Sequence, residues 1–294
     1  MKKYIVMDIG GTFIKSSVMS PDFKEESVKS TPTKRDPEEF LAQLVELIDG
    51  YKAEYGEILQ GIAISMAGFI NPVTGENTDY TCGQRFLKYN LKEKLKELTG
   101  LRVSVENDSN CAALAEMKIG AGVGAETVCV MTVGTGIGAA LIINGKLHRG
   151  KSFKAGELGF CVTKYNKDAA DLEPRRVVAT SILVKRCSEL LGKTVDGLYI
   201  FENLDKDAGI KAIYDEWVTD IAITVGNIAV ALDPEKFLIG GAVSTQKRFI
   251  DDLKAKVFSL YERLDEFTTI EACTQGNNAG KIGALTIFFD NYGE

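Results

Sequence analysis

The sequence has a single histidine, His148, and its six cysteines form no Cys-x-x-Cys pair. Structural zinc is usually held by four Cys or His side chains at short, regular spacings, so we expect no zinc site. Scattered cysteines of this kind instead predict reduced, mostly buried thiols, which are typical of cytosolic proteins.

The sequence also lacks a long apolar run and an excess of basic residues. The first apolar run, Tyr4 to Met7, is too short for a signal peptide, and the most apolar helix candidate, Ile221 to Leu232, is too short to span a bilayer. A formal net charge of −6 argues against a nucleic-acid partner, whose binding depends on neutralising phosphates with Lys and Arg. We therefore expect a cytoplasmic protein without membrane or nucleic-acid partners. A homodimer is one candidate oligomeric state, which the sequence does not determine.

The chain does contain enough apolar residues for two domains with separate cores. It has 294 residues, of which 45% are hydrophobic and 26% charged, as in soluble globular proteins. Strand and helix patterns alternate, which indicates α/β sheets. The glycine-rich joint at 120–124 predicts a boundary, with an N-terminal domain over 1–118 and a C-terminal domain over 119–280. We expect the terminal helix, from about 281 to 294, to pack back on the first domain.

Local signals predict most of the helices and strands. Asp36-Pro37-Glu38-Glu39 combines an N-cap acid with proline at the first helical position, and Asn90 begins a second helix that Gly100 ends. Further helices are predicted at 111–119 and at about 177–191, 210–232, 247–263 and 281–289. Buried strands are predicted at 4–7, 13–19, 61–65, 102–106, 128–133, 137–143, 236–239 and 268–272.

The first two strands enclose Asp8-Ile9-Gly10-Gly11-Thr12, so the tip of this hairpin is almost bare backbone. Paired glycines let a phosphate chain approach the N–H groups, and Thr12 adds a hydroxyl donor. Asp8 could hold Mg²⁺ through water, and Lys15 could screen phosphate charge. An ordinary tight hairpin is the alternative, because Gly-Gly turns are common.

A second hairpin repeats this pattern. The strand 128–133 ends in a glycine turn, Gly134-Thr135-Gly136, and Thr132 stands where Asp8 stood in the first hairpin. The repeat predicts two related halves that face each other across a cleft.

Two further motifs match known expressions by accident. Residues 145–152 fit the Walker A expression, but Gly156 and Gly159 follow where that motif requires a helix. Residues 134–139 fit the dinucleotide fingerprint, but they continue into a strand rather than a helix. We expect neither to bind a nucleotide in the manner of its motif.

Asn107 and Asp108 lie where a strand ends and a helix begins, a usual place for ligand groups in open α/β sheets. A carboxamide beside a carboxylate offers a sugar both a hydrogen-bonding partner and a base. Alternatively, Asp108 is only an N-cap, although Ser109 or Asn110 could take that role. Glu157 lies between two glycines on a loop, which favours a ligand group over a core residue.

These motifs together resemble the ROK family of the sugar kinase, Hsp70 and actin superfamily. Asp8-Ile-Gly-Gly-Thr12 resembles its first phosphate motif, and residues 106–116 resemble its catalytic motif. Residues 132–138 resemble its second phosphate motif, 155–159 its sugar loop, and Gly240-Gly241 its adenosine motif. The match covers nearly the whole chain in the family's order.

The resemblance implies a two-domain actin-like (ribonuclease H-like) α/β fold with a cleft, and an ATP-dependent sugar kinase that uses Mg²⁺. Asp108 would be the general base for the sugar's 6-hydroxyl. Sugar contacts would come from Ser65, Gly68, Asn107, Asp108, Glu157 and Phe160. The nucleotide would be held by Asp8, Gly10, Gly11, Thr12, Lys15, Thr132, Gly134, Thr135, Gly136, Gly240 and Gly241, with Mg²⁺ near Asp8.

The sequence departs from the family pattern in two places. The sugar loop ends in Phe160 instead of histidine, and the family's cysteine-rich zinc motif is replaced by residues 161–176. In these respects the chain is most similar to the β-glucoside kinases of the family. An aromatic face at Phe160 would suit a pyranose ring or an aglycone, unless Phe160 is a core residue. The expected substrate is a β-glucoside such as cellobiose.

Other functions remain open at this stage. A glucokinase or an N-acetylmannosamine kinase is the alternative within enzymes. The ROK sugar-sensing repressors form another class, but they carry a DNA-binding segment before the first hairpin, for which a strand beginning at about Tyr4 leaves no room. A non-catalytic actin-like assembly protein would have no use for the Asn107-Asp108 pair.

Overall fold

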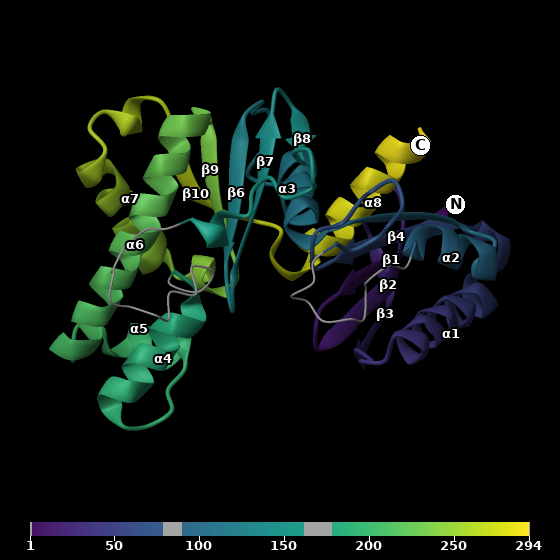
Figure 1. Ribbon diagram of the computed structural model, residues 1–294, viewed down its shortest axis with the longest axis horizontal. Coiled ribbons are helices and arrows are strands. Elements are labelled where there is room, and N and C mark those ends of the chain that lie inside the picture. The colour runs from purple at the N-terminus through teal and green to yellow at the C-terminus, as the bar shows by residue number, and fades with distance from the viewer. Residues whose placement is uncertain (1, 79–89, 162–177, 294) are drawn as a thin grey trace. The chain divides into compact units, whose positions relative to one another are not determined.

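The computed structural model describes residues 2–78, 90–161 and 178–293 (Figure 1). The chain divides into two compact units. Unit 1 comprises Met1–Ile119, Arg149–Lys154 and Asn277–Glu294, and unit 2 comprises Gly120–His148 and Ala155–Gly276. Cys82 and residues 162–177, about which the sequence raised expectations, lie outside the described residues.

Unit 1 is built on a five-stranded mixed sheet in the order β3-β2-β1-β4-β5. β1 pairs antiparallel with β2 to form the predicted hairpin, and it pairs parallel with β4, which pairs parallel with β5. The strands are β1 (Lys3–Ile9), β2 (Phe13–Met19), β3 (Glu25–Pro32), β4 (Leu59–Met66) and β5 (Arg102–Asn107). Strand β3 was not predicted, because its side chains are exposed or half-buried throughout and it has no apolar face.

The helices of unit 1 begin where their capping residues predict. The side chain of Asp36 accepts hydrogen bonds from the backbone N–H groups of Glu38 and Glu39 at 2.9 and 3.1 Å, and Asn90 accepts one from Glu93 N–H at 3.0 Å. The helices are α1 (Pro37–Tyr55), α2 (Leu91–Thr99), α3 (Asp108–Ile119) and α8 (Ala279–Tyr292). Helix α3 begins three residues before the predicted start.

Helices α3 and α8 cross at very short distance in unit 1, and Figure 1 shows the yellow α8 beside α3 and the sheet. A Cβ atom at Gly283 would lie 1.8 Å from the carbonyl oxygen of Cys111. Further along α8, Phe288 packs edge-on against Tyr4 of β1, with ring centroids 5.3 Å apart. The end of the chain thus completes the hydrophobic core on one face of the unit 1 sheet.

Unit 2 repeats the topology of unit 1. Its sheet has the order β10-β9-β6-β7-β8, in which β6, β7 and β8 are antiparallel and β6, β9 and β10 are parallel. The strands are β6 (Val128–Val133), β7 (Ile137–Ile143), β8 (Lys146–His148), β9 (Lys236–Gly240) and β10 (Thr269–Ala272). The internal repeat predicted from the two glycine turns is therefore present in the whole sheet order.

The helices of unit 2 surround a core that includes Trp217, which is 1% exposed. They are α4 (Thr180–Leu191), α5 (Gly197–Asn203), α6 (Ala208–Leu232) and α7 (Lys247–Leu260), and the short 3₁₀ turn η4 (Leu158–Phe160) overlaps the end of the predicted sugar loop at 155–159. Helix α5, which has only seven residues, was not predicted. Helix α6 begins two residues earlier than predicted, because Asp207 caps it. No helix in the described residues is both long and apolar enough to cross a membrane.

Candidate functional site

The tip of the first hairpin is bare backbone, formed by Gly10 and Gly11. The turn is closed by a hydrogen bond from Gly10 N–H to the carbonyl oxygen of Phe13 at 3.0 Å. Gly11 has no positive φ, and a Cβ atom placed there would meet nothing within 4 Å. Neither the backbone conformation nor packing demands glycine at this position, so the bare tip is compatible with close approach of a ligand, and the predicted phosphate contact stays a prediction.

Asp8 lies at the end of β1, and two elements of unit 1 fix its carboxylate. Ser65 of β4 donates a hydrogen bond to Asp8 Oδ1 at 2.9 Å. At the start of α8, a Cβ atom on Gly280 would lie 2.9 Å from the same oxygen, so glycine lets the positive end of this helix approach the carboxylate. Ser65 is 0% exposed, so its hydroxyl serves Asp8 in this structure, and a contact with the sugar remains a prediction.

The environment of Asp8 fits Mg²⁺. Mg²⁺ binds protein through one or two carboxylates and keeps several of its waters, and Asp8 is a half-buried carboxylate next to an exposed glycine turn. Lys15 is directly opposite Asp8 in the β1–β2 register, so both side chains lie on the same face of the sheet. An ammonium group on that face favours a polyphosphate.

The second hairpin has the same bare tip in unit 2. Gly134 N–H donates to the carbonyl oxygen of Gly136 at 3.0 Å, and a Cβ atom on Gly136 would meet nothing within 4 Å. Thr132 Oγ1 donates to the carbonyl oxygen of Gly138 at 3.2 Å, within its own hairpin. The exposed Thr135 lies at the tip, where its carbonyl oxygen accepts from Ser181 Oγ at 2.9 Å.

Gly240 and Gly241 pack directly on the end of β6. Gly241 has a φ of +91°, and a Cβ atom there would lie 2.2 Å from the carbonyl oxygen of Val133. A Cβ atom on Gly240 would lie 3.2 Å from Thr132 Cγ2. Unlike Gly11 and Gly136, Gly241 is required by the fold, and the close packing of both glycines brings the predicted adenosine and second phosphate motifs together in unit 2.

Asn107 is the residue that caps α3, so the N-cap alternative for Asp108, Ser109 or Asn110 is wrong. Its Oδ1 accepts from the backbone N–H of Asn110 at 3.0 Å, and its Nδ2 donates to the carbonyl oxygen of Gly68 at 2.9 Å. Gly68 has a φ of +114°, and the side chain of Asn77 fills the space where a Cβ atom would lie. These contacts connect the end of β5 to the turn after β4.

Asp108 has the electrostatic properties of a base. Its Oδ1 accepts from the backbone N–H of Ser109 at 2.8 Å. Burial raises the pKa of Asp108 above its usual range, and the negative charge of Asp8 raises it further, outweighing that hydrogen bond. A carboxylate with a raised pKa accepts a proton from a hydroxyl more readily than an ordinary one.

Glu157 and Phe160 belong to unit 2, whereas Asn107 and Asp108 belong to unit 1. Gly156, with a φ of +87°, packs against β7, and a Cβ atom there would lie 2.5 Å from the carbonyl oxygen of Ala139. Glu157 is half-buried directly after it. Phe160 is 40% exposed, so the interpretation of this residue as part of the core is wrong.

Neither the Walker A match nor the match to the dinucleotide fingerprint has the secondary structure that its motif requires. The residues after Gly145 form β8 and then an irregular segment, so the Walker A match lacks the required helix, and the fingerprint at 134–139 continues into β7. Among the described residues, no group of three or more His, Cys, Asp or Glu side chains could hold a metal ion. Five cysteines are described, all as free thiols, of which Cys111, Cys129 and Cys187 are buried.

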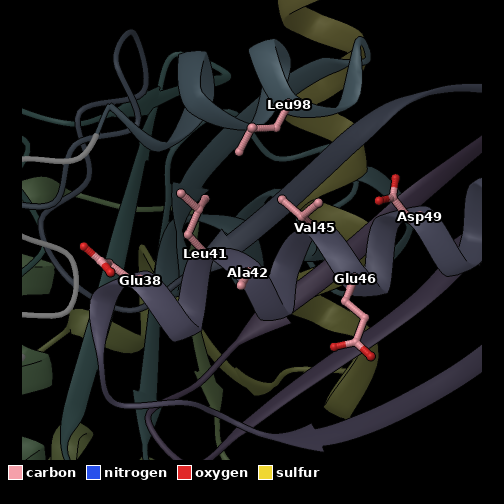
Figure 2. A pocket seen from close by; sticks show the side chains of 7 residues that line it. All are labelled: Glu38, Leu41, Ala42, Val45, Glu46, Asp49 and Leu98. Atoms are coloured by element: carbon pink, nitrogen blue, oxygen red, sulfur yellow. The ribbon is translucent and has the colours of Figure 1, made fainter.

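A surface groove of unit 1 lies apart from the predicted residues. Figure 2 shows that α1 and α2 line it with apolar side chains and with three carboxylates along α1. The residues that line the groove are Glu38, Leu41, Ala42, Val45, Glu46, Asp49 and Leu98. None of them belongs to the predicted site. It has neither the bare backbone nor the convergent polar groups that phosphate or sugar binding requires.

Known proteins resemble this chain over its whole length. The sequence model of the protein family described as the ROK family matches residues 4–291 of this chain. The beta-glucoside kinase of Listeria monocytogenes is 35% identical over 296 residues, which cover 97% of each protein. A Listeria monocytogenes structure proposed to be an N-acetylmannosamine kinase has a TM-score of 0.88 at 34% identity and covers 99% of both chains. A ROK family protein from Streptococcus pneumoniae, solved in complex with sucrose, has a TM-score of 0.85 at 30% identity, again covering 99% of both chains.

Proposed function

The chain belongs to the ROK family and is an ATP-dependent carbohydrate kinase, and from this premise we propose that it phosphorylates the 6-hydroxyl of a glucose unit in a β-glucoside. The observation that carries the proposal is Asp108, a partly buried carboxylate with a raised pKa at the carboxyl end of a parallel strand. Its neighbour Asn107 is already fixed by two hydrogen bonds.

In this proposal Asp108 accepts the proton of the 6-hydroxyl as the sugar oxygen attacks the γ-phosphorus of ATP, and the bond to the leaving ADP breaks. Asn107, the Gly68 turn and Glu157 hold the other hydroxyls. Because phosphoryl transfer depends mostly on positioning and on neutralising charge, one base and a set of donors suffice.

The nucleotide is proposed to bind at the two bare hairpin tips. The exposed backbone at Gly11 and Gly136 suits the phosphate chain, and neither glycine has a side chain that would keep it away. Gly240 and Gly241 would line the adenosine, and Thr12 and Thr135 add hydroxyl donors. Mg²⁺ would be held near Asp8 through water and would supply charge neutralisation of the phosphates.

The preference for a β-glucoside rests on Phe160. A histidine at the end of the sugar loop could hydrogen-bond hydroxyls near the anomeric carbon, whereas a phenylalanine cannot. The exposed face of Phe160 suits a pyranose ring or an aglycone. No buried polar group is left unpaired when the anomeric oxygen is substituted, so discrimination for the free sugar falls. Sucrose, found with the Streptococcus pneumoniae relative, is likewise a sugar without a free anomeric hydroxyl.

A coupled ATPase assay with cellobiose, glucose and N-acetylmannosamine tests this proposal. We expect kcat/KM for cellobiose to equal or exceed that for glucose in the wild type. Phe160→His should shift the ratio toward glucose, because it restores a polar contact near the free hydroxyl. A matched control is Phe267→His, since Phe267 is 59% exposed on a different part of unit 2. A clear wild-type preference for either monosaccharide would leave a plain hexose kinase.

A further inference from the structure

We propose that Arg149 is a positioning residue for the sugar site, acting through Glu106 to hold Asn107 and Asp108 in place. The proposal rests on the function proposed for Asp108. It assigns a role to the segment Arg149–Lys154, which contains the second half of the accidental Walker match and which belongs to unit 1 although both its flanking segments belong to unit 2. We call this segment the strap.

Glu106 is a fully buried carboxylate that accepts hydrogen bonds from residues at the start of α3. Its side chain is 0% exposed, and its Oε1 accepts from the backbone N–H of Asn107 and from Asn110 Nδ2, both at 2.9 Å. These two donors flank Asp108 in the sequence. Any movement of the Glu106 carboxylate therefore disturbs the backbone of Asn107 and the side chain of Asn110, on either side of the proposed base.

Arg149 compensates the charge of Glu106 with a two-point contact. Its Nε donates to Glu106 Oε2 at 2.8 Å, and its Nη2 lies 2.7 Å from the same oxygen. A buried carboxylate without a cation is costly, so removing Arg149 would leave Glu106 with an uncompensated charge. The guanidinium group fixes the orientation of the carboxylate as well as its charge, because its planar fork offers several donors in fixed directions.

The strap is fixed to unit 1 at its other end as well. The ammonium group of Lys154 lies 4.6 Å from the centroid of the Phe69 ring, and Phe69 directly follows Gly68. Gly68 in turn accepts the hydrogen bond from Asn107 Nδ2. Only Ala155 separates Lys154 from Gly156, which packs on unit 2 directly before Glu157. The strap therefore runs from the ion pair with Glu106 to the start of the sugar loop.

The ordinary alternative is that the ion pair only stabilises unit 1. Stability alone would reduce the amount of folded enzyme, without changing how tightly each folded molecule binds sugar. A positioning role predicts changes in sugar affinity and turnover with no change in ATP affinity. The two roles are therefore separated by affinities measured on folded protein.

The test compares Arg149→Met and Arg149→Lys with the double variant Arg149→Met/Glu106→Gln. The glutamine introduced in the double variant would keep the acceptor for Asn107 and Asn110 but would carry no charge that needs a cation. Arg248→Met is the matched control, because Arg248 makes a two-point contact with Asp205 at 3.0 and 3.1 Å on the exposed surface of unit 2. The readouts are kcat, both KM values, cellobiose affinity by calorimetry without ATP, and the melting temperature.

We expect Arg149→Met to lower kcat by roughly 10-fold or more and to weaken cellobiose binding, because a small misplacement of reacting groups has effects of that order. The KM for ATP should stay within about twofold, because the ion pair does not contact the residues proposed to hold the nucleotide. Arg149→Lys should be intermediate, and the double variant should recover a large part of the loss. Arg248→Met should match the wild type.

Three results would overturn the proposal: unchanged cellobiose affinity and kcat in folded Arg149→Met, a fall in kcat with unchanged cellobiose affinity, or a double variant no better than Arg149→Met. Failure of the proposed kinase function would be recognised separately. In that case the wild type would bind no sugar by calorimetry, or the Asp108→Asn variant would turn over as fast as the wild type.

Discussion

The two hairpins differ in the polar residue that ends their first strand, although they occupy the same place in sheets of the same order. In unit 1 that residue is Asp8, whose carboxylate accepts from Ser65 and lies against the start of α8. In unit 2 it is Thr132, whose hydroxyl is bonded within its own hairpin. The shared features are the bare glycine tips, and the difference is one negative charge.

This difference indicates how a repeated unit acquires two roles. Under the proposed function a bare turn binds a phosphate in either unit, which would account for a glycine tip in both hairpins. A carboxylate is useful only where it can hold a cation, and a second one near the phosphates would repel them. The hairpin of unit 1 therefore carries a carboxylate, Asp8, whereas the hairpin of unit 2 carries a neutral hydroxyl, Thr132.

The strongest test of this division removes the charge that performs the chemistry. Asp108→Asn keeps the shape of the side chain but cannot accept a proton, and we expect kcat to fall by about 10²-fold or more. The measurement is steady-state turnover of folded protein with the preferred sugar. Asp207→Asn is the matched control, because Asp207 also lies at a helix start but only caps α6 of unit 2. Near-normal turnover in Asp108→Asn would contradict the assignment of the base.

The likeness between the two tips is tested by placing a side chain on each. Gly11→Val and Gly136→Val should fold normally, since a Cβ atom at either glycine meets nothing within 4 Å. Each should raise the KM for ATP by about 10-fold or more, because the added side chain occupies the space of the phosphate chain. Lys151→Ala is the control and should leave this KM unchanged. The opposite pattern would favour a Walker-type site at 145–152.

A smaller effect is expected on stability, which should depend on pH in opposite directions at an aspartate of unit 1, Asp108, and an aspartate of unit 2, Asp205. The raised pKa of Asp108 means that the folded state binds this proton more tightly than the unfolded state, so stability falls as pH rises through that interval. At neutral pH, Asp108→Asn should therefore raise the melting temperature slightly, with the gain shrinking as the pH falls toward about 4, the ordinary pKa of an aspartate. Asp205→Asn should have the opposite sign, because Arg248 lowers the pKa of Asp205. Equal signs for the two variants would contradict this reading.

Zinc gives the smallest expected effect. We expect metal analysis of the purified protein to find no stoichiometric zinc, for want of Cys and His ligands at the required spacings. Activity should then survive zinc chelation as long as Mg²⁺ is supplied. Loss of activity that zinc restores would contradict this prediction.

The sequence predicted the parts of the fold that depend on neighbouring residues. The hairpins, the caps at Asp36 and Asn90 and the repeat of the glycine turns were found because a few adjacent residues specify each of them. Strand β3 was missed because pairing with β2, rather than an apolar pattern of its own, makes it a strand. Helix α5 was missed because seven residues are too few to show a helical period.

The parts of the candidate site that depend on distant contacts were not predictable. Glu106 and Arg149 are 43 residues apart, and no local pattern connects them. One signal was available, because Glu106 follows Val103 and Val105 in a predicted buried strand and a carboxylate there requires a partner. The partner itself could not be chosen among 35 Lys and Arg residues without the fold.

The position of α8 has a consequence for the way the protein is made. Unit 2 ends at Gly276, so all of it is synthesised before residues 277–294. The hydrophobic core of unit 1, by contrast, is incomplete until α8 has been synthesised. During this interval the apolar face of β1 and β4 is uncovered, and it is a target for chaperones or for aggregation. Translation that stops before α8 would leave this face uncovered, and Asp8 would lack the helix start that holds it.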